Sequence, residues 1–394
     1  MAQRNLIKIM KIIFIAVVIA LADIPEAYSS LCPKLCTCSN TIINCKYGSM
    51  KTIPSRNTTA TAILAISITN SDLTAIAAEN FTMYPNIRVL KFERNTISRI
   101  EPNSFCNATK IYSLTLTYNF LQNLNKSSLA CLVNLRFLRL GFNSIKTIPD
   151  ALFSGLNSLE LLVLFGNQIK EIRQNTFNCL TKLKYLDLAY NLIAYVATIS
   201  FRHLNSLITL GLSENHLIEV DRNYFDLNPN LKSLYLGNNF LTKINPRTLC
   251  NLTALQNLNL PLNSISHIQP NAFKGLDNLY SLDLSENFLL TIRASDFAGI
   301  PTLKILDLNH NHIRRIESGA FCGIPNVKTI SLNGNNLNYI ARKSLTCLAK
   351  VITLDLNINN IADIESRSFC SLPNLQYLYL FEIPFRILPV LSKL

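Results

Sequence analysis

The chain has 394 residues, and its 37 lysine and arginine residues against 24 acidic residues give a formal net charge of +13 at pH 7. Glycine is scarce, with 11 residues, which leaves little room for the loops that carry chemistry. The sequence contains no GxSxG, no HExxH and no phosphate-cradling glycine loop. We therefore expect neither an enzyme nor a cofactor.

Residues 1–29 have the layout of a secretory signal peptide. Basic residues precede an apolar run at 12–22, and small residues follow near Ala27. An uncleaved membrane anchor is the alternative, but the run is shorter than the roughly 18–20 residues that span a bilayer. We expect a secreted protein that is not membrane-spanning.

Residues 30–62 contain four closely spaced cysteines in the pattern C-x3-C-x-C-x6-C, namely Cys32, Cys36, Cys38 and Cys45. In a secreted chain such a cluster indicates disulfide bonds. A metal site is the alternative, and it suits reducing compartments better. The segment is predicted to be a disulfide-bonded N-terminal cap.

From Ile63 to residue 382, apolar residues recur with a period of 24 in fourteen consecutive units, without insertion or deletion. The unit that begins at Leu159 follows the pattern LxxLxLxxNxIxxIxxxxFxxL. Such regular self-similarity is the signature of a solenoid. We expect an α/β solenoid, a curved horseshoe with a concave parallel β-sheet and about fourteen 24-residue repeats.

Each recurring position of the unit has a physical role. Positions four and six (Leu162 and Leu164) point inward from a short strand, whereas positions three, five and seven point outward. Position nine is Asn in twelve units, from Asn95 to Asn359, and a buried amide can donate and accept hydrogen bonds where the chain leaves the sheet. Position nineteen is Phe in ten units, including Phe201, and these rings are expected to fill the core behind the sheet.

Residues 63–382 resemble the leucine-rich-repeat family, in the 24-residue form common in extracellular proteins. Residues 31–45, followed by Ile53 and Pro54, resemble the N-terminal cap of Slit-like proteins and small leucine-rich proteoglycans. This resemblance implies that the first cap cysteine pairs with the third and the second with the fourth. Carried over to this chain, the pairs are Cys32–Cys38 and Cys36–Cys45.

Residues 383–394 depart from that family. Ile383, Pro384 and Phe385 stand where a C-terminal cap usually opens with Asn-Pro-Phe, and no cysteine follows. A short apolar tail that folds over the last repeat, a truncated product and an edge that meets a partner are three open explanations.

Seven further cysteines occupy positions twenty and twenty-one of the repeats. Cys106 with Cys131, and Cys322 with Cys347, lie in neighbouring units at the same offset, within reach of a disulfide. Cys370 is a competitor for Cys347. Cys179 and Cys250 are three repeats apart, too far to bridge, and are expected to be small buried apolar residues, with an intermolecular bridge as the alternative.

Five sites have the sequence of an N-glycosylation acceptor: Asn57, Asn80, Asn107, Asn125 and Asn251. The four inside repeats fall at positions fifteen to twenty-one, away from the strand. Glycans are therefore expected on the convex side, which leaves the concave sheet bare.

The outward positions three, five, seven and eight carry the candidate binding residues. From the first repeats to the last, the residues at these positions are at first basic, then mainly aromatic and apolar, and finally polar and acidic. Contiguous exposed apolar groups mark interaction sites, and aromatic residues and Arg anchor interfaces. The alternative is that neighbouring side chains merely shelter one another. The candidates are Lys91, Arg94, Tyr118, Phe137, Arg139, Phe142, Leu161, Val163, Phe165, Tyr185, Tyr190 and Tyr235.

The acidic residues of the later repeats, Asp283, Glu286, Asp307 and Asp355, are interpreted as a solvated face or as a second contact for a partner. Asp307, His310 and His312 are close in sequence, but the two histidines straddle a turn residue, and no metal site is expected there.

Together these features predict an extracellular protein-binding module that grips an extracellular or cell-surface protein on its concave face. An innate-immune recognition ectodomain is one alternative. A structural matrix component that binds collagen or sulfated glycans through its basic charge is another. Nucleic acid is not expected, because we expect the chain to be secreted and because its basic residues are scattered. Glycan binding should weaken as salt rises, whereas an aromatic interface should persist.

Overall fold

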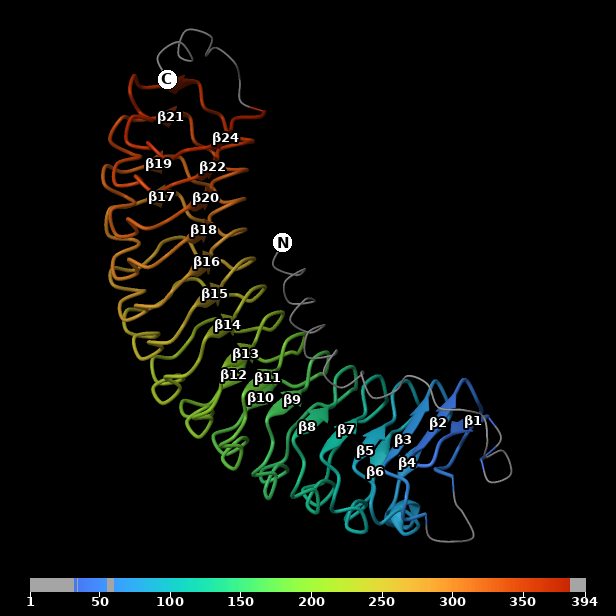
Figure 1. Cartoon of the computed structure of the whole chain (residues 1–394). Helices are drawn as coiled ribbons and strands as arrows, with labels where there is room; N and C mark the ends of the chain where they lie inside the picture. Colours follow the sequence, from blue (N-terminus) through green and yellow to red (C-terminus); the bar gives the residue numbers. More distant parts are fainter. Residues whose placement is uncertain (1–31, 34, 55–59, 383–394) are drawn as a thin grey trace.

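The computed structural model describes residues 32–33, 35–54 and 60–382, which form one curved solenoid (Figure 1). The predicted signal peptide, the tail at 383–394 and the acceptor site Asn57 lie outside the described residues. Within the described ranges, no helix has both the length and the apolar character needed to cross a membrane.

A single sixteen-stranded sheet follows the inner side of the arc. Fourteen of its strands belong to the repeats and run parallel, and each pairs with a partner 24 residues away, as Leu162 does with Leu186. The predicted solenoid, its concave parallel sheet and its fourteen repeats are thus confirmed. In spatial order the strands are β1 (Cys36–Cys38), β2 (Ile42–Lys46), β3 (Ala65–Thr69), β5 (Val89–Lys91), β7 (Ser113–Thr115), β8 (Phe137–Arg139), β9 (Leu161–Val163), β11 (Tyr185–Asp187), β13 (Thr209–Gly211), β14 (Ser233–Tyr235), β15 (Asn257–Asn259), β16 (Ser281–Asp283), β18 (Ile305–Asp307), β20 (Thr329–Ser331), β22 (Thr353–Asp355) and β24 (Tyr377–Tyr379).

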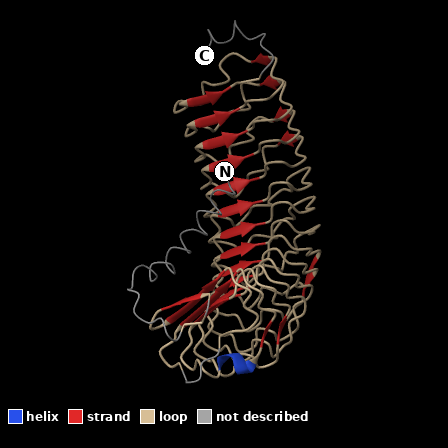
Figure 2. Ribbon diagram, turned by 90° about the vertical axis from the view of Figure 1, so that its right-hand side faces the viewer, coloured by secondary structure: helices blue, strands red, loops and turns tan. Residues whose placement is uncertain are grey.

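Behind this sheet the chain forms mainly turns (Figure 2). The expected α/β solenoid has very little helix: among the described residues the 3-10 helix η1 (Ala78–Phe81) is the one helix. The back of each repeat instead closes in short turns, such as the one in which the Leu180 N–H donates to the Phe177 carbonyl. Four two-stranded ladders add to it: β4 (Ala75–Ile76) with β6 (Arg99–Ile100), β10 (Glu171–Ile172) with β12 (Tyr195–Val196), β17 (Thr291–Ile292) with β19 (Arg315–Ile316), and β21 (Tyr339–Ile340) with β23 (Asp363–Ile364).

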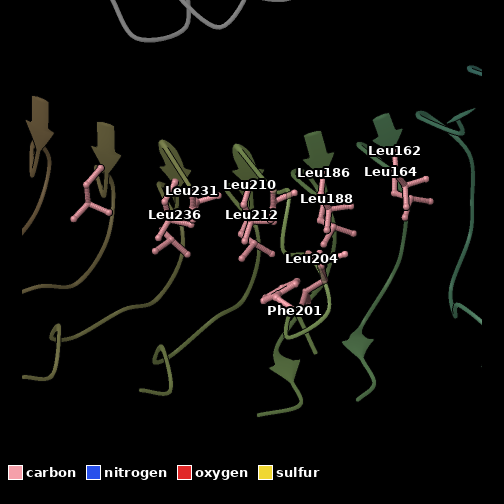
Figure 3. Close-up of a cluster of buried hydrophobic side chains, with 14 of the residues drawn as sticks. Leu162, Leu164, Leu186, Leu188, Phe201, Leu204, Leu210, Leu212, Leu231 and Leu236 are labelled. Atoms are coloured by element: carbon pink, nitrogen blue, oxygen red, sulfur yellow. The ribbon is translucent and has the colours of Figure 1, made fainter. Parts of the chain in front are cut away.

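The core is a continuous stack of leucines behind the sheet and phenylalanines further back (Figure 3). Leu162, Leu164 and their equivalents in the repeats that begin at residues 63 to 351 are fully buried, whereas Leu378 and Leu380 of the last repeat are partly buried. The Phe177, Phe201 and Phe225 rings stack with centroid distances of 6.2 and 6.0 Å. Since neighbouring strands are only about 4.8 Å apart, the wider spacing of the rings at the back bends the stack and places the sheet on the inside of the curve.

The asparagines of position nine form the predicted buried ladder. The Asn215 Nδ2 donates to the carbonyls of Leu188, Leu212 and Ser213 at 3.0, 3.1 and 3.1 Å, and its Oδ1 accepts from the Ile193 N–H at 2.9 Å. One amide therefore satisfies backbone groups of two neighbouring repeats at the point where they leave the sheet.

Four disulfides tie the chain at three places. Cys32–Cys38 and Cys36–Cys45 hold the antiparallel β1–β2 pair at the N-terminal end. Cys106–Cys131 and Cys322–Cys347 each link two neighbouring repeats on the convex side. Cys370 is free and exposed.

Cys179 and Cys250 are also free, but the expectation that they are buried is wrong. Both are partly exposed, because positions twenty and twenty-one lie in the convex turns, where the repeats spread apart.

Candidate protein-binding face

The residue at position eight of each repeat sets the edge of the concave face. From Asn70 to Glu382 this residue has a φ angle between 50° and 68°, whatever its type. This left-handed conformation is unusual for bulky side chains. It turns the chain out of the sheet and exposes the side chain at the rim, so a residue placed there is available to a partner.

Four aromatic residues at this rim make a continuous column, here called the aromatic column: Tyr118, Phe142, Phe165 and Tyr190. The Tyr118 and Phe142 rings are almost parallel, with centroids 4.2 Å apart, and Phe165 contacts Phe142 edge-on at 5.0 Å and Tyr190 at 4.8 Å. The Arg94 guanidinium lies 4.4 Å from the Tyr118 ring centroid and ends the column with a positive charge.

Gly166 makes this packing possible. It occupies position eight between Phe142 and Tyr190, and a Cβ added to it would lie 2.9 Å from the Phe142 ring. Because that position has no side chain, Phe165 at position seven fills the gap between the two rings. Tyr118, Phe142 and Tyr190 remain 40%, 41% and 46% exposed. The stack is therefore held by its own contacts and still offers a wide apolar surface.

A second aromatic contact lies across the strands. Phe137 on β8 packs edge-on against Tyr112 at 6.5 Å, and the Arg136 guanidinium lies 5.5 Å from the Phe137 ring. Tyr112 and Arg136 are at position two of their repeats, which the outward-position pattern does not include, so the sequence interpretation missed them.

Leu161 does not belong to the exposed surface. It is only 6% exposed, because Phe137 and Tyr185 pair with it on the two neighbouring strands and cover it. Val163, Arg139 and Tyr235 are half-buried, and Lys91 forms a 3.0 Å ion pair with Glu93. For position three of this repeat, the alternative of mutual shelter is the correct one.

The middle of the face contains a polar group of three side chains, the buried Asp187 and the half-buried Arg139 and Tyr185. The Tyr185 hydroxyl donates to the Asp187 Oδ2 at 3.3 Å, and the Ala189 N–H donates to its Oδ1 at 3.0 Å. Burial raises the pKa of the Asp187 carboxyl to about 6, although both hydrogen bonds favour the ionised form. Burial also lowers the pKa of Arg139 and raises that of Tyr185.

The raised pKa of Asp187 predicts a dependence of stability on pH. Because the pKa is higher in the fold than the value of about 3.9 in an unfolded chain, the contribution of this carboxyl is fully present below pH 4 and is lost as pH rises through 6. Relative to wild type, Asp187→Asn should gain about 1–3 kcal/mol of unfolding free energy between pH 4.5 and pH 7.5.

Urea denaturation of both proteins at pH 4.5, 6.0 and 7.5 measures this difference. Asp355→Asn, at the same position of a later repeat but half-exposed, is the control. A difference between Asp187→Asn and wild type that stays constant with pH would contradict the assignment.

The later repeats present a polar face. Asp283, Asp307 and Asp355 each accept a hydrogen bond from the backbone N–H two residues ahead. Burial raises the pKa of Asp307 to about 6. The His312 ring lies against Phe288, with centroids 5.4 Å apart. In the described part of the chain, no group of three or more His, Cys, Asp or Glu is arranged to hold a metal ion.

The glycan acceptor sites lie away from the sheet. Asn107, Asn125 and Asn251 are exposed in the turns of the back, and Asn80 is in η1, where its Oδ1 accepts from the Ala77 N–H at 2.8 Å. A modification at these sites would leave the concave face accessible. The combination of an aromatic column, a flanking Arg and a bare sheet suits the recognition of another macromolecule.

Comparison with known proteins gives one family. The leucine rich repeat matches the chain in eight overlapping stretches that together run from residue 109 to residue 382, more than half of the chain: 109–169, 162–217, 209–263, 229–287, 255–313, 277–337, 301–361 and 325–382. A search of curated proteins gives no match.

Solved structures share the fold at low identity. A leucine-rich-repeat protein of Leptospira interrogans is 24% identical, with a TM-score of 0.72 over 85% of this chain and 82% of that chain. A chain of the Drosophila Toll–Spatzle complex is 21% identical, with a TM-score of 0.76 over 84% of this chain and 46% of its own length.

The ectodomain of an Arabidopsis thaliana membrane receptor kinase, solved with Casparian strip integrity factor 2, is 21% identical, with a TM-score of 0.56 over 82% of this chain and 45% of that chain. This chain spans less than half the length of the Drosophila and Arabidopsis proteins. At these identities the likeness concerns the fold.

Proposed function

The chain belongs to the leucine-rich-repeat family, and on this basis we propose that it is a secreted, non-enzymatic module that binds another protein on its concave face. The observation that carries the proposal is the aromatic column. Tyr118, Phe142 and Tyr190 expose large apolar surfaces in a left-handed conformation that bulky residues avoid. Solvent-exposed aromatic rings beside an Arg are the usual anchors of protein interfaces.

A rigid scaffold supports this role. The sheet, the asparagine ladder and the phenylalanine stack hold the column in place before a partner arrives, so little conformational entropy is lost on binding. Proteins of the same fold have been solved in complexes with Spatzle and with Casparian strip integrity factor 2. The Slit-like and proteoglycan-like character of the cap is part of the same proposal, as is the secreted state.

The test is capture from extracellular fluid and cell surfaces with the immobilised chain. A specific protein partner should be retained by wild type and should bind the variant Tyr118→Ala/Phe142→Ala/Tyr190→Ala at least about thirtyfold more weakly, a loss typical of central anchors. The control Phe120→Ala/Leu227→Ala/Tyr280→Ala removes three exposed apolar residues elsewhere and should bind like wild type.

The basic charge favours a second candidate, a matrix component that binds sulfated glycans. Salt distinguishes the two. An aromatic interface should persist when ionic strength rises from 0.15 to about 0.5 M, whereas glycan binding should collapse. Equal retention of all three proteins, followed by release in salt, would reject the aromatic column and favour the glycan.

A further inference from the structure

A second apolar surface lies on the flank of the solenoid, outside the concave face. After each turn at position eight, the side chains at positions ten, twelve and thirteen point to solvent, whereas those at nine, eleven and fourteen are buried. In the middle repeats this flank carries large apolar residues, Leu192, Tyr195, Ile218, Phe240, Phe288, Leu290 and Tyr339, and Leu262 at position eight of the adjoining rim extends them. We call the flank of the seven repeats that begin at residues 183 to 327 the lateral strip.

Along the lateral strip, the residues at position ten are arranged about a central repeat. Its central repeat presents Ser264 at position ten. One repeat away on either side lie Phe240 and Phe288, 54% and 50% exposed, and two repeats away lie His216 and His312. His216 contacts Phe240 at 5.7 Å and Phe288 contacts His312 at 5.4 Å, so both halves of the row are built alike.

A surface that meets its own copy across a two-fold axis must complement itself. We propose that a second copy of this chain docks on the lateral strip, antiparallel to the first, with the axis at Leu262 and Ser264. Phe240 of one copy then packs on Phe288 of the other. Three repeats from the axis, the exposed Tyr195 meets Tyr339 of the second copy.

Three pairs of polar residues agree with this arrangement. At position eight, Glu214 faces His310 of the second copy and Asn238 faces its Glu286. At position thirteen, the exposed Glu219 faces the exposed Arg315. Glu214 already accepts from the Asn238 side chain and has further acceptor sites for an imidazole N–H. A parallel arrangement would set equivalent repeats against each other and would not bring Glu219 and Arg315 together.

The curvature of the solenoid also favours the antiparallel arrangement. The lateral strip follows an arc, and only the antiparallel arrangement, with both concave faces open in the same direction, superimposes two such arcs along their whole length. Figure 2 shows the strands of the C-terminal half stacked regularly. From a strand spacing of about 4.8 Å and a rise of about 3.3 Å per residue, the strip measures about 34 by 20 Å, or about 700 Å² per copy.

That area is slightly below the roughly 800 Å² per partner of a standard interface, so we expect a dimer that dissociates reversibly. The acceptor sites Asn80, Asn107, Asn125 and Asn251 fall at other positions of the repeat, so glycans would not cover the lateral strip. The dimer would present two concave faces side by side.

Sedimentation equilibrium of the full chain, from about 1 to 100 μM, tests the proposal. Wild type should associate reversibly, and Phe240→Asp/Phe288→Asp should weaken association at least about thirtyfold. Phe120→Asp is the matched control, since Phe120 is the same residue type at position ten, 57% exposed, in a repeat outside the lateral strip. A monomeric wild type, or equal loss in the control, would overturn the proposal.

Charge reversal tests the antiparallel register. Glu219→Arg and Arg315→Glu should each weaken the dimer about tenfold, because two symmetric pairs become repulsive, and the double variant should restore it. Failure of this rescue would reject the register. Thermal melts confirm that the variants fold, and non-reducing gels identify any covalent dimers formed through the exposed Cys370.

Discussion

Replacement of Phe201 by Ala is expected to lower the free energy of unfolding by about 3–5 kcal/mol. Phe201 is fully buried, and its ring stacks on Phe177 at 6.2 Å and on Phe225 at 6.0 Å. Both neighbours would lose a partner, and the turns of the adjacent repeats are held by their own hydrogen bonds, so the space could close only in part. Urea denaturation followed by circular dichroism measures the loss.

Two variants serve as controls. Leu129, Leu249 and Leu345 occupy the same position in other repeats and are fully buried, so Phe201→Leu should cost only about 1 kcal/mol. Phe120→Ala, on the exposed flank, should change stability by no more than about 0.5 kcal/mol. If Phe201→Ala were as mild as Phe120→Ala, the phenylalanine stack would not be a main support of the fold.

Asn215→Ala is expected to cost about 2–4 kcal/mol, since it removes four hydrogen bonds at once, three of them buried and one partly buried. The carbonyl groups of Leu188 and Leu212 keep a second donor from the neighbouring asparagines. The Ile193 N–H has Asn215 as its partner. An unpaired buried N–H is the largest part of the expected cost.

Hydrogen exchange gives this prediction a local readout. The Ile193 amide should exchange much faster in Asn215→Ala than in wild type, while amides several repeats away should change little. Asn205→Ala replaces an exposed asparagine of the preceding repeat, which also contains Ile193, and should leave both stability and exchange unchanged. If the Ile193 amide exchanged as slowly in the variant as in wild type, another group, such as a water molecule, would have replaced the lost Asn215 side chain.

Much of the fold can be predicted from the sequence because its period has a direct physical meaning. An uninterrupted period of 24 aligns Leu162 with Leu186 and fixes the register of every strand pair. The same alignment places Asn next to Asn, Phe next to Phe, and Cys106 near Cys131. Contacts between equivalent positions of neighbouring repeats need no further information.

The candidate site is less predictable, because it depends on side-chain directions and not on register. Tyr118 and Phe142 could be placed at the rim, but their parallel stacking depends on a left-handed turn and on the missing side chain of Gly166. Leu161 looked equivalent to Phe137 in the pattern, yet its neighbours cover it. The row at position ten was missed entirely, since it follows the turn and its symmetry appears only once the repeats are stacked.

The stacking of the repeats also has a mechanical consequence. In the main sheet every strand of the described chain pairs only with the strand before and the strand after it. A pull on the two ends would therefore load the repeats in series, and the solenoid would stretch as a spring whose stiffness falls with each added turn. The disulfides Cys106–Cys131 and Cys322–Cys347 each link two neighbouring repeats covalently near the two ends. They limit how far peeling can advance from either end and leave the middle repeats as the elastic segment.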